Sequence, residues 1–197
     1  MNFSDNKFYY NRLTEEIAQD IELCLCEGIK SKDVYRYWEY PIEILDKSQA
    51  VYVKWQVIRS KNMKQQWDLY GFAGPNESYE PSIEIIIFLK PGIWQSKANI
   101  DGGSLRNVIS HELHHLAQNI ETDPPKDCYE YFVCEHEAEA FRMGFRAQSN
   151  FSGIPESTLM ERYLQPRVDN GELSIRQIDK IMDRWLNVDW RLVNARN

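Results

Sequence analysis

The chain has 197 residues, of which 43% are hydrophobic and 27% charged, a composition typical of one globular domain. Its net charge of −7 argues against nucleic acid as a partner and against binding to an anionic membrane surface. The longest apolar run, IIIFL, is far too short to span a membrane, and the start of the chain does not resemble a signal peptide. None of the four cysteines forms a C-x-x-C pair, so we expect reduced thiols in a cytoplasmic protein.

The first part of the chain predicts a helix followed by strands. A helix is expected over residues 11–30, where four apolar side chains recur at every fourth position. Residues 50–60 alternate and are rich in β-branched and aromatic side chains, which predicts a strand, and residues 61–74 predict a turn and a second strand. Residues 82–90 form the clearest strand, which ends at Pro91 and Gly92.

The part of the chain after residue 100 predicts helices. A turn over residues 101–104 supplies a helix N-cap, and the helix runs to about Ile120, because the following Pro124-Pro125 pair cannot continue it. Further helices are expected near residues 133–149, 155–165 and 174–188. Because the strands precede the helices instead of alternating with them, we expect an α+β fold.

The stretch ISHELHHLAQ, residues 109–118, contains three of the four histidines and matches the zinc-binding pattern H-E-x-x-H. On an ideal helix His111 and His115 lie about 40° apart, so their imidazoles can converge on one ion. Glu112 then lies about 80° from the middle of that pair, where it can approach a metal-activated water without ligating the metal. A pair of His111 and His114 would leave Glu112 pointing elsewhere, so we interpret His114 as a bystander or as support for a ligand. The alternative is a helix that merely carries surface histidines.

Catalytic zinc usually has three protein ligands, so a third ligand is required. The downstream stretch YFVCEHEAEAFRMGF offers Glu135, His136, Glu137 and Glu139. Glu135 and Glu139 share a helix face with two arginines, and for Glu139 we expect a solvated, charged surface. Glu137 lies about 200° around the helix from Glu135, among apolar and small residues, where a carboxylate must be paired or bind a metal. Glu137 is therefore the expected ligand, with Glu135 and His136 as alternatives.

These stretches resemble the gluzincin-type zincins, and most closely the small single-domain metallopeptidases of bacteriophages and bacteria. IEIIIFL corresponds to the strand, HELHHLAQ to H-E-x-x-H with a nearby glutamine, and YFVCEHEAEAFRMG to the helix that carries the ligand glutamate. This alignment assigns the ligand to Glu137. EHEAEAF also resembles the corresponding helix of lethal-factor-like and Pro-Pro endopeptidases, which would make Glu135 the ligand and Glu139 the support of a histidine.

The resemblance covers about residues 80–190, and it implies a single zincin-like domain over 1–197 with this region as its catalytic core. Residues 1–75 would add an N-terminal helix and the first strands of a small, mostly antiparallel sheet. The active-site helix, the glutamate helix and the C-terminal helices would follow. A phage-encoded member would act in the host cytoplasm.

The activity that the resemblance implies is that of a zinc metallopeptidase acting on a peptide or protein substrate. His111, His115 and Glu137 would hold Zn²⁺, and Glu112 would be the general base for the metal-activated water. Tyr131 and Tyr129 are candidate donors to the oxyanion, with a buried structural tyrosine as the alternative. An extended substrate would pair with the sheet edge near the active-site helix, which would be residues 82–90. A strand as apolar as this one is equally explained as part of the core. The alternative is a non-catalytic, zinc-stabilised binding or regulatory protein with a zincin-like fold, and Glu112 counts against it because a structural site needs no such residue.

Overall fold

The protein folds as a helix, a sheet and a series of helices, as the α+β prediction requires. The computed structural model describes residues 3–26, 34–44, 47–61, 63, 65–75, 80–90, 100–118 and 125–187. In chain order the elements are α1 (Phe3–Cys26), β1 (Val34–Ile44), β2 (Lys47–Arg59), β3 (Trp67–Pro75), β4 (Pro81–Leu89), α2 (Gly102–Gln118), α3 (Cys128–Val133), α4 (Glu135–Ser152), α5 (Glu156–Asp169) and α6 (Ile175–Leu186). None of the described helices has the length and apolar character needed to cross a membrane.

The four described strands form one mixed sheet in the order β1-β2-β4-β3. β1 is antiparallel to β2 and β3 is antiparallel to β4, whereas the central pair β2 and β4 is parallel. β1 has no counterpart among the strands predicted from the sequence. Pro41 within it argues against a strand, but a proline is tolerated in a strand that lies at the edge of a sheet, as β1 does.

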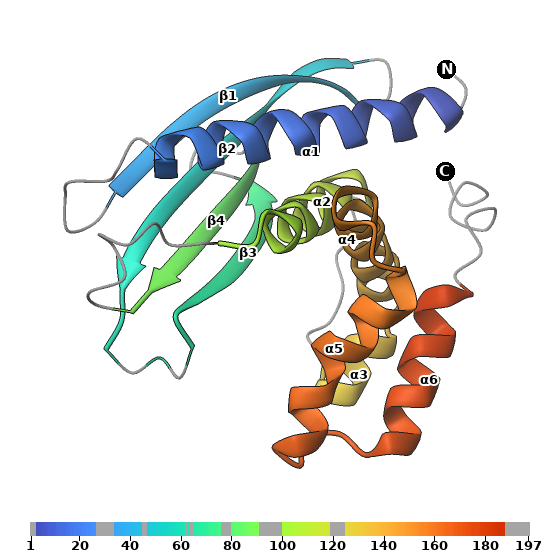
Figure 1. The fold of residues 1–197 in the computed structure, drawn as a ribbon. Coiled ribbons are helices and arrows are strands. Elements are labelled where there is room, and N and C mark those ends of the chain that lie inside the picture. Colours follow the sequence, from blue (N-terminus) through green and yellow to red (C-terminus); the bar gives the residue numbers. More distant parts are fainter. Residues whose placement is uncertain are drawn as a thin grey trace.

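The position of β4 corrects one expectation. The sequence-based prediction placed the substrate-binding edge at residues 82–90, but β4 pairs with β2 on one side and with β3 on the other. Its apolar character instead reflects its central position, because Ile83, Ile85 and Ile87 are fully buried on one face. The edge next to the histidine-bearing helix is β3, which lies beside α2 (Figure 1).

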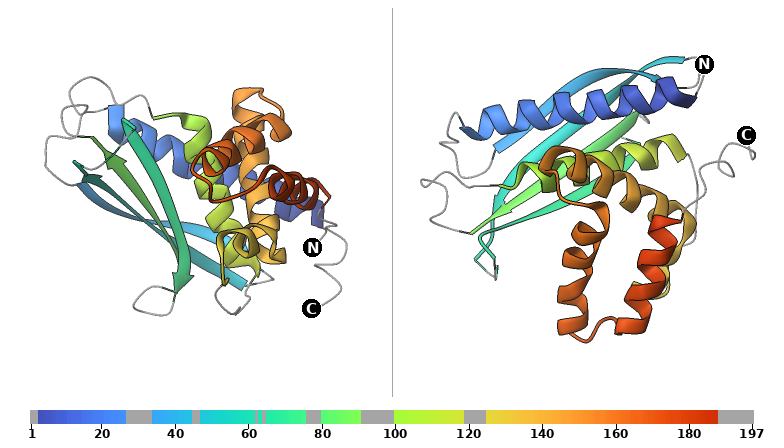
Figure 2. Two further views of the ribbon diagram at one scale, coloured as in Figure 1. Left: turned by 90° about the horizontal axis from the view of Figure 1, so that it is seen from below. Right: turned by 45° about the vertical axis from the view of Figure 1, so that its right-hand side comes forward.

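One hydrophobic core lies between the sheet and the first two helices. Both α1 and α2 lie on the same face of the sheet (Figure 1), and Figure 2 shows this sheet on one side of the molecule and the helices on the other. The apolar stripe predicted for the N-terminal helix is buried against the strands through Leu13, Ile17 and Ile21, which are at most 3% exposed. From α2, Leu105, Ile109 and Leu113 enter the same core.

A second core joins α3, α4, α5 and α6 and is dominated by aromatic rings. Trp185 of α6 stacks on Phe141 of α4 with 4.5 Å between ring centroids. Its indole nitrogen donates a hydrogen bond of 2.7 Å to the carbonyl oxygen of Phe132 in α3. α2 and α4 pack against each other between the two cores, so their contact connects the sheet half of the molecule to the helical half.

A buried arginine ties α1 to α2. Arg106 is 2% exposed, and its guanidinium donates to Glu15 at 2.8 Å and to Glu22 at 2.6 Å. The same guanidinium lies 3.9 Å from the ring centroid of Phe151 in α4. Because a buried charge requires partners, this group fixes the N-terminal helix to the two helices that carry the candidate site.

Candidate metal centre

The first two residues of the centre come from the middle of α2. Asp101 caps this helix by accepting a hydrogen bond of 2.9 Å from the backbone nitrogen of Ser104. The apolar side of α2 is buried against the sheet, which turns His111 and His115 toward α4. Their Nε2 atoms lie 3.0 Å apart, so the two rings converge as the i,i+4 spacing predicts.

The third residue comes from the first turn of α4. Glu137 Oε2 lies 3.4 Å from His111 Nε2, and Glu137 Oε1 lies 3.5 Å from His115 Nε2. His111, His115 and Glu137 therefore form one compact group of two imidazoles and a carboxylate that could bind a metal ion. Among the described residues no other group of this kind is found.

The spacing and the chemistry of these atoms fit a metal. Zinc–ligand bonds of about 2.0–2.1 Å in a tetrahedral site place neighbouring ligand atoms about 3.3 Å apart, which is close to the three distances above. Glu137 Oε2 is also buried without a hydrogen-bond partner among the described residues. Such an orphaned carboxylate oxygen is costly unless a cation or a proton donor satisfies it.

The electrostatics of the metal-free centre suit coordination by His111 and Glu137 but favour the protonated form of His115, whose proton a metal would have to displace. Burial lowers the pKa of His111, which keeps this ring neutral and able to coordinate. Burial alone would raise the pKa of Glu137, but the adjacent rings of His111 and His115 hold it well below its usual range. Burial also opposes protonation of His115, yet the carboxylate of Glu137 outweighs this effect and raises its pKa.

Glu112 lies outside this group, between α2 and the edge strand β3. It is 8% exposed, and burial raises the pKa of its carboxyl from 4.5 to about 7. Gly71 of β3 makes room for it, because a Cβ atom at position 71 would lie 2.6 Å from Glu112 Oε1. The side chain is thus held between the helix and the strand, one residue from His111 but on a different flank of α2.

Tyr131 lies next to the carboxylate of the group. It belongs to α3, and its ring packs edge-on against Phe141 with 5.7 Å between centroids. Burial and then the charge of Glu137 raise the pKa of this phenol well above its usual range, so it stays protonated. Tyr131 is therefore a neutral hydroxyl donor beside Glu137.

The other candidates for the third ligand occupy different positions. Glu135 is exposed at the start of α4 and does not belong to the group, so the structure brings Glu137 to the two histidines. His136 is also outside the group of three, but its Nε2 lies 3.7 Å from Glu137 Oε1.

The expectation of a solvated surface for Glu139 is wrong. Its side chain is 2% exposed, accepts a hydrogen bond of 2.9 Å from Gln118 and lies 3.6 Å from His114 Nε2. The physical reason is the close contact of α2 with α4, in which a Cβ atom at Gly144 would lie 2.8 Å from the backbone oxygen of Asn107. At this distance long side chains on both flanks of α4 reach α2, so Glu137 and Glu139 are both covered.

The roles of two residues around the centre were not predicted from the sequence. Gln118 was noted only as the glutamine of the family pattern, although its i+3 spacing from His115 could have identified it as a partner of the ring. Gly71 is a glycine inside a strand, which often marks a close approach of the backbone to another group.

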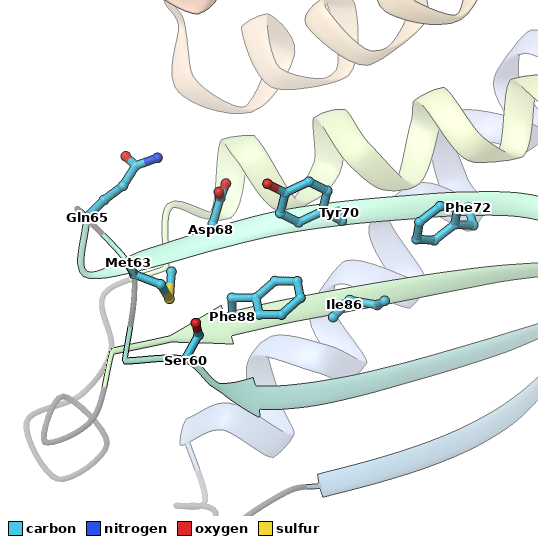
Figure 3. A pocket seen from close by; sticks show the side chains of 8 residues that line it. All are labelled: Ser60, Met63, Gln65, Asp68, Tyr70, Phe72, Ile86 and Phe88. Carbon is cyan, nitrogen blue, oxygen red and sulfur yellow. The ribbon is translucent and has the colours of Figure 1, made fainter. Parts of the chain in front are cut away.

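A hollow of about 570 Å³ lies elsewhere, on the outer face of the sheet (Figure 3). It is lined by Ser60, Met63, Gln65, Asp68, Tyr70, Phe72, Ile86 and Phe88. Along β4, Ile86 and Phe88 alternate with the buried isoleucines that face the helices. Ile86 and Phe88 therefore line the hollow from the face of the sheet opposite to the helices.

Comparison of the chain with profiles of protein families, with curated proteins and with solved structures finds no significant match. The function must therefore be argued from the residues and their geometry.

Proposed function

We propose that this protein is a zinc-dependent metallopeptidase that hydrolyses peptide bonds. The proposal is carried by the convergence of His111, His115 and Glu137 beside a buried carboxylate, Glu112, that is not one of the three. A structural zinc site requires its ligands but does not require an additional carboxylate with a raised pKa.

The proposed ligands of the zinc ion are His111, His115 and Glu137. Two imidazoles and one carboxylate are a common ligand set of catalytic zinc, which keeps a further coordination position for water or substrate. A bound zinc ion supplies Lewis acidity toward a carbonyl group and toward water.

Glu112 and Tyr131 are the proposed catalytic side chains. With a pKa of about 7, Glu112 can accept a proton from the attacking water and pass it to the leaving amine near neutral pH. The protonated hydroxyl of Tyr131 can donate a hydrogen bond to the oxyanion that develops on the scissile carbonyl.

The proposed substrate is an extended peptide paired with β3. This strand pairs with β4 on one side, and its other side meets no strand among the described residues. An added strand would be held by main-chain hydrogen bonds. A peptide residue opposite Gly71 would lie next to Glu112, because paired residues of neighbouring strands share a face of the sheet.

Metal analysis of matched variants tests the zinc site. We expect stoichiometric zinc in the wild type and in Glu135→Gln, whose side chain is exposed on the same helix, and loss of zinc in Glu137→Gln. Retention of zinc by Glu137→Gln would contradict the ligand assignment. A wild type that holds no zinc after reconstitution would overturn the site as a whole.

Peptidase activity requires a separate experiment. The zinc-loaded wild type is incubated with a peptide library and the products are identified by mass spectrometry, with zinc-loaded Glu112→Gln as the control. We expect cleavage by the wild type and a loss of at least about 100-fold in the variant, the lower range for removal of a general base. Equal cleavage by both proteins would exclude Glu112 as the base, and a zinc-loaded wild type that cleaves nothing would favour a binding or regulatory role.

A further inference from the structure

The amide of Gln118 connects one proposed ligand to the helix that carries another. Gln118 is the last residue of α2, and its Oε1 lies 2.9 Å from His115 Nδ1. Its Nε2 donates to Glu139 Oε2 and to the backbone carbonyl oxygen of His136, each at 2.9 Å. Both of the latter partners belong to α4.

These partners allow only one orientation of the amide. A carbonyl oxygen accepts hydrogen bonds only, and so does an ionised carboxylate. If the amide were flipped, its oxygen would face these two acceptors and both contacts would be lost. The Nε2 group must therefore face α4, and the oxygen must face His115.

The orientation of the amide in turn determines where the ring of His115 carries its proton. Because Gln118 Oε1 is an acceptor, His115 Nδ1 must be the protonated nitrogen that donates to it. The neutral ring then has its lone pair on Nε2, the atom that lies 3.0 Å from His111 Nε2 and 3.5 Å from Glu137 Oε1. This is the tautomer that can coordinate a metal at the centre.

We propose that Gln118 is a positioning residue that, held by Glu139 and the His136 carbonyl, fixes the tautomer of His115 and so raises the metal affinity of the centre. The affinity part of this inference rests on the proposed zinc site, whereas the tautomer part concerns the metal-free protein. Glu139 is suited to the role because its buried carboxylate is an acceptor with little access to water.

A second amide between the same two helices provides a matched control. Asn107 of α2 donates to Gln148 Oε1 of α4 at 2.9 Å, a contact as short as those of Gln118, and neither residue belongs to the metal group. Gln118→Leu and Gln148→Leu each remove one glutamine amide from the α2–α4 contact. Only the first change affects the partner of a proposed ligand.

The first measurement is zinc affinity by competition with a chromophoric chelator. We expect Gln118→Leu to weaken zinc binding by about 10- to 100-fold, the usual effect of removing a partner of a ligand, while Gln148→Leu keeps the wild-type affinity. Wild-type affinity in Gln118→Leu, or an equal loss in both variants, would overturn the proposal, because the amide would then support only the helix contact.

The second measurement is the tautomer of His115 in the metal-free protein, from the ¹⁵N chemical shifts of the ring nitrogens at alkaline pH. We expect the Nδ1–H form in the wild type and in Gln148→Leu, and a mixture of both tautomers in Gln118→Leu. A wild type in the Nε2–H form would overturn the proposal even if zinc binds. If zinc does not bind, this measurement still tests the proposal.

If Gln118→Leu does not fold, Glu139→Gln replaces it in both measurements. Glutamine has nearly the same shape as glutamate but can also donate, so the amide of Gln118 could then adopt either orientation. We expect a mixture of tautomers and weaker zinc binding, and wild-type results in both experiments would contradict the proposal.

Discussion

At the residue scale, the buried environment of Glu112 bears on both the proposed chemistry and the stability of the protein. Its carboxyl is 8% exposed, and burial raises its pKa to about 7 from 4.5. Between these two values the folded protein holds a proton that the unfolded chain releases, so stability must fall as the pH rises through this range. A group suited to proton transfer near neutral pH is thus a cost to the folded state.

Glu112→Gln should remove this pH dependence. In the metal-free protein, the stability of the variant relative to wild type is expected to increase by on the order of 3 kcal/mol from about pH 5 to about pH 8, because the wild type must ionise a buried carboxyl over this range. Urea unfolding with a chelator present measures the difference at each pH. Glu135→Gln controls for the removal of one exposed carboxylate from the chain. A difference between variant and wild type that stays constant with pH would contradict the prediction.

The two glutamates of α4 illustrate what residue spacing can and cannot predict. Spacing selected Glu137 because it lies among small and apolar residues, and the structure brings this carboxylate to both histidines. The same reasoning failed for Glu139, whose burial depends on how closely α2 approaches and on what α2 presents there. The angular position of a residue on its own helix contains no information about the neighbouring helix.

At the scale of elements, the edge strand β3 determines where the proposed base can lie. At Gly71 the strand approaches α2 so closely that a Cβ atom would overlap with Glu112 and would lie 2.7 Å from Val108 Cγ1. At Gly74 of the same strand a Cβ atom would meet nothing within 4 Å. Alanine substitutions at the two glycines therefore form a matched pair, one in a crowded position and one in an open position of the same strand.

Gly71→Ala should displace Glu112 while Gly74→Ala should not. We expect Gly71→Ala to lose about 1–3 kcal/mol of stability through overpacking, and peptidase activity to fall by up to about 100-fold through misplacement of the base. Both variants should keep their zinc, since the proposed ligands lie on the other flank of α2. Chemical denaturation, metal content and peptide cleavage are measured for both variants and compared between them. Equal activity in the two variants would show that the close contact of β3 with α2 does not position Glu112.

The sheet was predicted only in part, because the sequence pattern of a strand does not show which strands lie beside it. Residues 82–90 were identified as a strand because β-branched residues dominate them, but their alternation cannot distinguish a central position from an edge. The order β1-β2-β4-β3 arises from pairings between distant segments, and β1 also contains a proline that argues against a strand. Local patterns therefore identified strands but not their neighbours.

At the scale of the whole molecule, the proposed centre lies where the two hydrophobic cores meet. α2 contributes His111 and His115 and packs on the sheet, whereas α4 contributes Glu137 and packs in the aromatic core. A metal held by all three side chains would connect the two halves of the protein.

Zinc should therefore stabilise the whole fold. At a free zinc concentration about 100 times its Kd, the folded state is expected to gain about 2.7 kcal/mol if the unfolded chain does not bind the ion. The midpoint of thermal unfolding should rise with zinc in the wild type and stay constant in Glu137→Gln. A wild-type midpoint that does not respond to zinc would contradict the proposed site.

The buried arginine between α1 and α2 has a consequence for how small a working form of this protein can be. All five residues proposed to bind the metal or act on the substrate lie between His111 and Glu137, yet Arg106 depends on two carboxylates near the start of the chain. A shortened chain that began after α1 would lose both counter-ions of Arg106 and would expose the apolar core that Leu13, Ile17 and Ile21 cover. The two helices of the proposed centre therefore depend on the N-terminal helix, and transplanting them into another scaffold would require that helix as well.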